Sequence, residues 1–177
     1  MEHNYALQTL LRANIPLFHG LSIDELREFV RHCNMQQTNR GDIIIAYGEY
    51  NSKIYIVLGG LYEALVYIDQ GLKRFNKLSV GDSMGGQSLI LNVPHASEFR
   101  CLKGGVLLTF DRLDLVKIPN LQLKIYKNLC RIMTKRLLMM REWAPGVLGR
   151  KASRKTYLHF GVKIFRYRYA GHVLNRV

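Results

Sequence analysis

Acidic residues are scarce in this chain, and they are unevenly distributed along it. The 177 residues include 26 Lys and Arg but only 13 Asp and Glu, which gives a net charge of +13. The net charge is +5 from Met1 to Glu142 and +8 from Trp143 to Val177, where no acidic residue occurs. A charge excess concentrated in one segment points to a polyanionic partner, such as nucleic acid, an acidic protein or anionic lipid headgroups.

The sequence also lacks the motifs of the common enzyme classes. It contains no Ser/His/Asp or Cys/His signature, no HExxH zinc motif and no Walker loop. The carboxylates in or next to the glycine-rich stretch described below are Asp82 and Glu98, and Glu98 is assigned to a strand. We therefore expect a protein that is not an enzyme and that requires no metal or cofactor.

Long apolar runs and paired cysteines are missing as well. No run approaches the roughly 20 apolar residues that cross a bilayer as a helix, and Met1–Tyr5 is too polar to begin a signal peptide. This pattern predicts a cytoplasmic protein. The cysteines, Cys33, Cys101 and Cys130, are odd in number and lack CxxC spacing, which favours buried free thiols over a disulfide or a metal site.

Short β-rich runs, separated by turn residues, fill the middle of the chain from residue 35 to residue 116. Strands of about four to seven residues at this spacing predict an antiparallel sandwich or roll. Leu61–Tyr67 and Leu72–Leu78 are separated by a short turn and predict a hairpin with one wet face.

Two short helices are predicted before the strands. Residues 4–13 fit an amphipathic helix that Pro16 ends. Ser22 followed by Glu25 is a capping-box pattern, which predicts a second helix over residues 22–32. These helices are expected to pack on the roll rather than to carry chemistry.

A long helix is predicted after the strands, over residues 120–142, and the Pro and Gly of Trp143–Gly146 predict its end. The chain therefore divides into a domain of residues 1–142 and an extension of residues 143–177. The main apolar stripe of the helix is Ile125, Leu129, Met133, Leu137 and Met140. Ile132, Leu138 and Met139 make the apolar surface wider than one contact face requires.

The stretch Gly81–Ser97 is the centre of the predicted functional site. Gly85 and Gly86 lack a Cβ atom, so this turn can adopt positive φ and let an anion approach the N–H groups of residues 85–88. The residues of this turn predicted to contact a ligand are Gly85, Gly86, Gln87 and Ser88. The alternative is a bare loop between two strands, which binds nothing.

These features resemble the cyclic nucleotide-binding domain family, which includes the catabolite activator class of regulators and the regulatory domains of some kinases and channels. The family's landmarks occur in order over about the first four-fifths of the chain. They are Ile15–Phe18, Leu21–Leu26, Arg40–Ile43, Tyr47–Glu49, Ile54–Val57 and Gly81–Asp82. The resemblance implies an α+β fold, in which an antiparallel jelly-roll-like β-roll is flanked by N-terminal helices and a long C-terminal helix.

The phosphate-binding cassette of the family reads approximately Phe-Gly-Glu-x-Ala-Leu and then Pro-Arg-Thr/Ser-Ala. Met84–Leu89 and Pro94–Ser97 align with it, but the ribose-binding Glu is replaced by Gly86 and the phosphate-binding Arg by His95. The resemblance adds His95, Ala96 and Ser97 to the predicted ligand contacts, and it implies that Asp82 helps to hold a turn. A charged hydrogen bond contributes about 1.5–3 kcal/mol. Losing both contacts would weaken binding by about two to four decades. We therefore expect poor or absent affinity for cAMP and cGMP, and interpret His95 as a surface histidine.

The resemblance also suggests partners for the long helix. In the transcription regulators of the family the equivalent helix pairs with its twin, which predicts a homodimer through residues 120–142; burial against the chain's own domain is the alternative. The regulators then continue into a winged helix-turn-helix domain. Residues 143–177 are too few for a complete one.

The C-terminal extension combines cations with aromatic residues, as nucleic-acid surfaces do. Its predicted polyanion contacts are Arg150, Lys151, Arg154, Lys155, Lys163, Arg166 and Arg168. An edge strand or a poorly ordered tail is the alternative. The sequence thus predicts a non-enzymatic regulatory or ligand-binding module. In one version it still binds a cyclic nucleotide or related small ligand, and in the other it has lost the ligand and acts through dimerisation or partner docking. The alternative function is a transcription regulator-like protein whose basic end contacts DNA or RNA.

Overall fold

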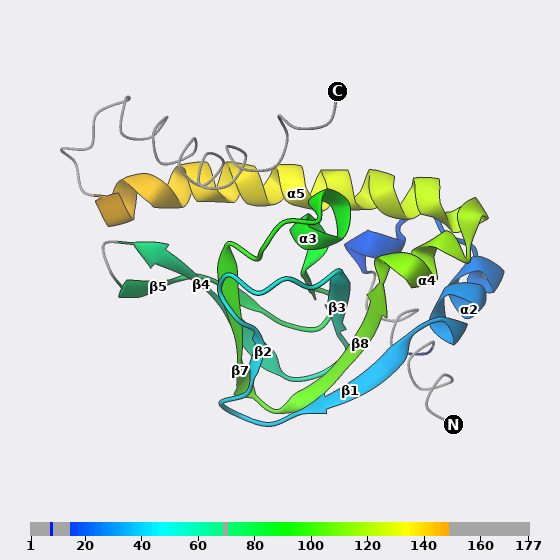
Figure 1. Cartoon of the computed structure of the whole chain (residues 1–177), viewed down its shortest axis with the longest axis horizontal. Coiled ribbons are helices and arrows are strands. Elements are labelled where there is room, and N and C mark those ends of the chain that lie inside the picture. The colour runs from blue at the N-terminus through cyan, green and yellow to red at the C-terminus, as the bar shows by residue number, and fades with distance from the viewer. Residues whose placement is uncertain (1–7, 9–14, 69–70, 149–177) are drawn as a thin grey trace. The chain divides into compact units, whose positions relative to one another are not determined.

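The computed structural model describes residues 8, 15–68 and 71–148, and the side chains of residue 68 and of residues 143–148 are not among the described ones. Contacts divide the chain into two compact units, Met1–Lys135 and Arg136–Val177. Of the described elements, which Figure 1 draws as ribbons, the first unit contains all the strands and the last helix up to Lys135. The predicted helix over residues 4–13 lies outside the described residues except for Gln8.

In the described part of the chain, eight strands form two antiparallel four-stranded sheets. The first sheet has the order β1 (Asn34–Thr38), β8 (Gly105–Asp111), β3 (Lys53–Val57), β6 (Ser83–Met84). The second has the order β2 (Ile43–Ile45), β7 (Ser97–Lys103), β4 (Leu61–Ile68), β5 (Gly71–Leu78). The predicted hairpin is the β4–β5 pair, with a bulge between Ala64 and Leu65. This arrangement confirms the α+β roll predicted from the sequence.

The first sheet is covered on both faces, and strand β3 shows why. Tyr55 and Val57 point into the cluster between the two sheets, together with Tyr62 and Phe99. Ile54 and Ile56 belong instead to a second cluster, which the helices of the first unit complete. Because successive side chains of a strand alternate between its faces, a strand packed on both sides is apolar throughout, as the run Ile54–Val57 is.

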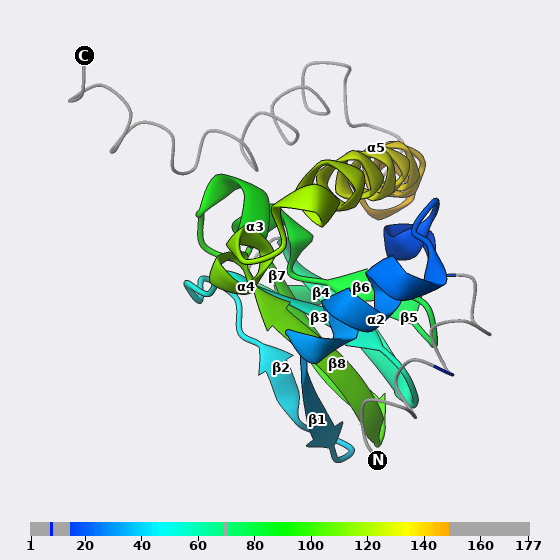
Figure 2. The same cartoon turned by 90° about the vertical axis from the view of Figure 1, so that its right-hand side faces the viewer.

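Short helices close the helical side of this sheet (Figure 2). They are η1 (Pro16–Phe18), α2 (Ile23–Arg31) and α4 (Arg112–Val116). Helix α2 begins as predicted, because the Ser22 hydroxyl accepts the Glu25 N–H and the Glu25 carboxylate accepts the Ser22 N–H. Phe29 of this helix packs edge-on against Phe18 and Phe110, which fixes it on the sheet.

Helix α5 (Pro119–Leu148) is longer than predicted. The expected end at Trp143–Gly146 was wrong, because the helix continues through Pro145. A proline removes one helical hydrogen bond and crowds the preceding turn. Here it lies near the helix end, and most of the residues before it are good helix formers, so the preceding helix tolerates it.

The cysteine prediction was correct in two of three positions. Cys33 and Cys101 are buried free thiols, whereas Cys130 is a free thiol on an exposed position of α5. The reason is the helical period: Leu129, one residue earlier, takes the fully buried position, and a step of about 100° turns Cys130 toward solvent.

Candidate ligand-binding cassette

The cassette begins at a tight turn between β5 and β6. Asp82 Oδ2 accepts the Ser79 N–H at 2.9 Å, in agreement with the predicted turn role of Asp82. Gly85 then has φ +87°, and a Cβ atom built on it would lie 2.2 Å from the Lys53 carbonyl oxygen. No other residue fits there without moving the backbone of β3, so Gly85 is a structural requirement of the turn.

Helix α3 (Gly86–Leu91) follows directly, next to α5 in Figure 1. A Cβ atom on Gly86 would lie 3.2 Å from Leu129 Cδ2 and 3.2 Å from Met133 Cε. The position that aligns with the family's ribose-binding Glu therefore faces apolar side chains of α5. A carboxylate added here would have to displace those side chains or lie unpaired among them, which is costly.

The amide groups of α3 are partly occupied. Both the Ser88 and the Leu89 N–H groups bond to the Gly85 carbonyl oxygen, at 3.1 and 3.3 Å. Of the amides predicted to hold an anion, that of Ser88 thus already has a partner within the turn. Gln87 is exposed, and Ala96 and Ser97 are half-buried where the cassette leads into β7.

His95 is buried, with 4% of its surface exposed, so its prediction as a surface histidine was wrong. Its backbone N–H donates to the Glu49 carbonyl at 2.9 Å, and its carbonyl accepts the Gly48 N–H at 2.8 Å. This pairing with the β2–β3 loop directs the ring inward. Nδ1 lies 3.2 Å from Ser88 Oγ, and Nε2 lies 3.1 Å from Asn51 Oδ1. Both ring nitrogens therefore have partners within the protein.

The Asn51 amide fixes the tautomer of the ring. Asn51 Oδ1 accepts the Lys53 N–H at 3.1 Å, and Asn51 Nδ2 donates to Glu49 Oε1 at 2.7 Å. The oxygen of the amide thus faces His95, so Nε2 is the nitrogen that carries a proton. Glu49 lies within the predicted landmark Tyr47–Glu49, but the sequence predicted no role for Glu49 or for Asn51.

Burial and charge act against each other on the two titratable groups of this network. Burial lowers the pKa of His95, and the nearby Glu49 carboxylate only partly opposes it. Burial alone would raise the pKa of Glu49, but the donors of Ala46 and Asn51 and the proximity of His95 outweigh it, so that the pKa lies below its ordinary value. The network thus favours a neutral imidazole next to an ionised carboxylate.

Ser88, His95 and Asn51 have the composition of a nucleophilic triad but not its geometry. The Ser88 side chain is fully buried, and its oxygen lies 2.8 Å from the Val93 carbonyl as well as 3.2 Å from His95 Nδ1. One hydroxyl proton serves these two acceptors, and a substrate cannot reach the oxygen. Hydrogen bonds among these three residues instead connect α3, the end of the cassette and the β2–β3 loop.

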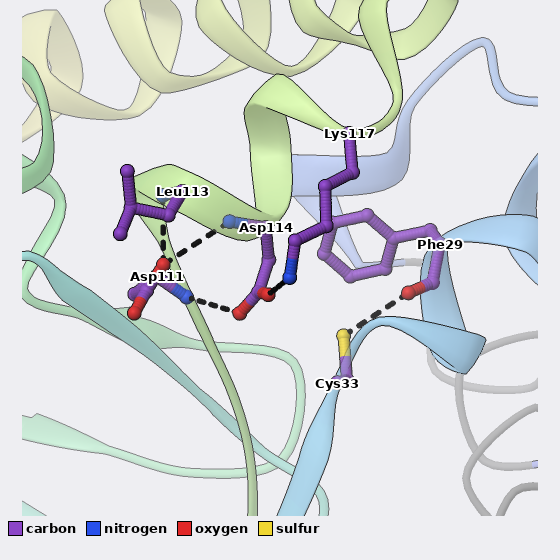
Figure 3. Close-up of polar contacts among 6 residues, drawn as sticks. All are labelled: Phe29, Cys33, Asp111, Leu113, Asp114 and Lys117. Atoms are coloured by element: carbon purple, nitrogen blue, oxygen red, sulfur yellow. Dashed lines mark hydrogen bonds and ion pairs between the residues drawn. The ribbon is translucent and has the colours of Figure 1, made fainter.

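A separate cavity of about 260 Å³ lies on the first sheet, lined by Asn34, Met35, Gln36, Lys53, Thr109, Phe110, Asp111 and Asp114. Its carboxylates serve as helix caps (Figure 3). Asp111 Oδ1 accepts the Leu113 and Asp114 N–H groups, and Asp114 bonds to the Asp111 N–H and to Lys117. These bonds outweigh burial and hold the pKa of Asp114 below its ordinary value.

The Cys33 side chain, shown with the helix caps in Figure 3, also has a structural role. The Cys33 thiol donates to the Phe29 carbonyl at 3.3 Å (Figure 3). Burial, helped by the Asp114 carboxylate, raises the pKa of Cys33 well above its ordinary value, so the thiol stays protonated and unreactive.

The remaining predicted positions fall into two groups. Glu98 lies on β7 as predicted and forms an ion pair with Arg100. The predicted polyanion contacts of the C-terminal extension, from Arg150 to Arg168, lie outside the described residues. Within residues 8, 15–68 and 71–148, no three His, Cys, Asp or Glu side chains are grouped to hold a metal ion. None of the helices in the described part of the chain combines the length and the hydropathy needed to cross a bilayer.

Comparison with known proteins relates this architecture to a known fold. A cyclic nucleotide-binding domain from Methylobacillus flagellatus KT superposes with a TM-score of 0.72, at 19% identity, over 84% of this chain and 85% of the other. The chain has the cyclic nucleotide-binding domain fold. The catabolite activator protein of Thermus thermophilus superposes with a TM-score of 0.66, at 20% identity, over 75% of this chain and 62% of that protein.

A sequence relative is consistent with this fold. A cAMP-dependent protein kinase regulatory subunit from Mycosarcoma maydis is 30% identical over 92 residues, which are 52% of this chain. The match spans only 18% of the length of that subunit. No family model matches the chain.

Proposed function

We propose that this chain is a non-enzymatic regulatory module whose cassette binds cyclic nucleotides weakly or not at all. The observation that carries the proposal is that both anchor positions are already used within the protein. Gly86 faces Leu129 and Met133, and both nitrogens of His95 have protein partners. A nucleotide would find neither a carboxylate for its ribose nor a cation for its phosphate at these positions.

The pKa of His95 supports the same proposal. An arginine forks onto a phosphate through two charge-assisted hydrogen bonds and stays charged at any physiological pH. His95 has a lowered pKa, so at neutral pH its ring is uncharged. To turn toward a phosphate it would have to leave Ser88 and Asn51 and then gain a proton, and each step costs free energy.

Isothermal titration of the purified chain with cAMP, cGMP and cyclic di-GMP tests the proposal. We expect no saturable binding with a Kd below about 1 μM, which corresponds to about −8.2 kcal/mol. The double variant Gly86→Glu with His95→Arg supplies a carboxylate and a guanidinium at the two anchor positions, but Leu129 and Met133 still occupy the space next to residue 86. We expect it to bind poorly until Leu129→Ala and Met133→Ala are added. Tight cAMP binding by the unaltered chain would contradict the proposal.

A module without a nucleotide signal must act through other contacts, and we include two in the proposal. The first is dimerisation or partner docking on α5, whose distal part has exposed apolar side chains. The second candidate function is nucleic-acid contact by the extension, favoured by its net charge of +8 over residues 143–177. Removing residues 149–177 should then abolish nucleic-acid binding, which should also weaken steeply with added salt.

A further inference from the structure

Among the described residues, the distal part of α5, in the second compact unit, carries an exposed apolar surface. Leu137, Leu138 and Met139 are consecutive and are 61%, 52% and 44% exposed. Since residues of a helix are about 100° apart, these three side chains spread over roughly 200° of its circumference. Single exposed apolar residues are ordinary, but a helix that is apolar around most of its circumference is typically buried.

The same unit is strongly cationic. Its residues, Arg136–Val177, include ten Lys and Arg and one acidic residue, Glu142. In the described part, Arg141 is an exposed cation two residues after Met139. A partner must therefore supply both a wide apolar contact and negative charge.

We propose that the distal part of α5 docks as a helix into the apolar groove of an acidic protein. A groove surrounds a helix on more than one side, as an arc of 200° requires, and carboxylates on its rim complement the cations. This inference rests on the proposed function, because it specifies the partner of the docking step. It makes the partner a different protein rather than a second copy.

The charge and the shape disfavour the other occupants. A second copy would bring two units with a net charge of +9 each together, and like charges at an interface are unfavourable. A lipid surface covers one side of a helix and leaves the rest of the apolar arc in water. Nucleic acid would engage the cations but offers no cover for three aliphatic side chains, since its contacts are mostly with phosphates.

Calcium-loaded calmodulin is a suitable probe, because it is acidic and exposes a Met-rich apolar groove when calcium is bound. The full chain is titrated with it in the presence of calcium and of a chelator. We expect a Kd of about 1 μM or tighter with calcium and none that is measurable without it. The triple variant Leu137→Gln, Leu138→Gln, Met139→Gln should weaken binding at least tenfold.

A matched control is Leu123→Gln, since Leu123 is 78% exposed on the same helix but in the first unit. It should bind the probe as the unaltered chain does, and both variants should keep the unaltered thermal melt by circular dichroism. Absence of calcium-dependent binding, or equal binding by the triple variant, overturns the inference. The inference is also overturned if the chain is a dimer by sedimentation equilibrium and the triple variant is a monomer. Binding to a single-stranded oligonucleotide or to phosphatidylserine vesicles overturns it as well, if the triple variant loses that binding. Cyclic-nucleotide titration tests the proposed function independently of these outcomes.

Discussion

Helix α5 has one sequence pattern but two kinds of surroundings. In the first unit, Ile125 and Leu129 are fully buried, and Leu129 packs closely against Gly86, which has no side chain. In the second unit, Leu137 and Leu138 continue the apolar character but are mostly exposed. Periodicity thus predicts that a segment is helical and which residues share a face. It does not predict what covers that face, since the cover comes from distant parts of the chain or from another molecule.

The largest expected difference between the two parts of α5 is in the free energy of unfolding that is lost when one leucine of each part is replaced by alanine. Leu129→Ala removes a fully buried side chain and should lower the free energy of unfolding by about 2–5 kcal/mol. Leu138→Ala removes a side chain that is half exposed and should change it by no more than about 0.5 kcal/mol. Urea unfolding followed by circular dichroism measures both. Equal costs would mean that the two parts of the helix are packed alike.

The pH dependence of stability sharpens the comparison on the packed side. The pKa of His95 is lowered in the folded chain, so the unfolded chain takes up this proton first, near its ordinary pKa of about 6.5. Stability should be complete above that pH and should fall as the pH decreases through it. Glu49, whose pKa is also lowered, should contribute a separate loss near and below its ordinary pKa of about 4.3.

The variant His95→Gln isolates this contribution. Urea midpoints measured between pH 8 and pH 5 should fall less steeply for the variant than for the unaltered chain. Leu138→Gln, in the exposed part of α5, should keep the unaltered slope. An unchanged slope in His95→Gln would show that the pKa of His95 is the same in the folded and unfolded states.

Local features of the fold were predictable because they depend on near neighbours in the sequence. The Ser22–Glu25 capping box joins residues three apart, and the β4–β5 hairpin is defined by alternation on either side of a short turn. The glycine-rich stretch was expected between strands of the roll, and its helix α3 lies between β6 and β7. The replacements at Gly86 and His95 rest on the resemblance, so the weakened cassette stays a prediction.

What these two residues do instead was not predictable. His95 bonds to Asn51, 44 residues earlier, and Gly86 faces Leu129, which lies in a different helix. Neither contact leaves a local pattern, and a histidine in a polar stretch reads as a surface residue. Glu49 was the one signal available, because an acidic residue within a predicted landmark needs donors, and the structure gives it the Ala46 N–H and Asn51 Nδ2.

The smallest expected effect concerns an ion pair that joins the packed part of α5 to α2. Lys124 Nζ lies 2.7 Å from Glu25 Oε1, and both side chains are partly exposed. Because water and salt screen such pairs, a double-mutant cycle with Lys124→Met and Glu25→Gln should give a coupling of only about 0.2–1 kcal/mol. The coupling should decrease in 1 M salt, where the screening length is about 3 Å. Arg141→Gln, in the distal part, is the matched charge change and should leave the urea midpoint unaltered. A coupling that persists in high salt would contradict the assignment of this ion pair to the screened surface. A lower urea midpoint for Arg141→Gln would show that surface charge also stabilises the distal part of the helix.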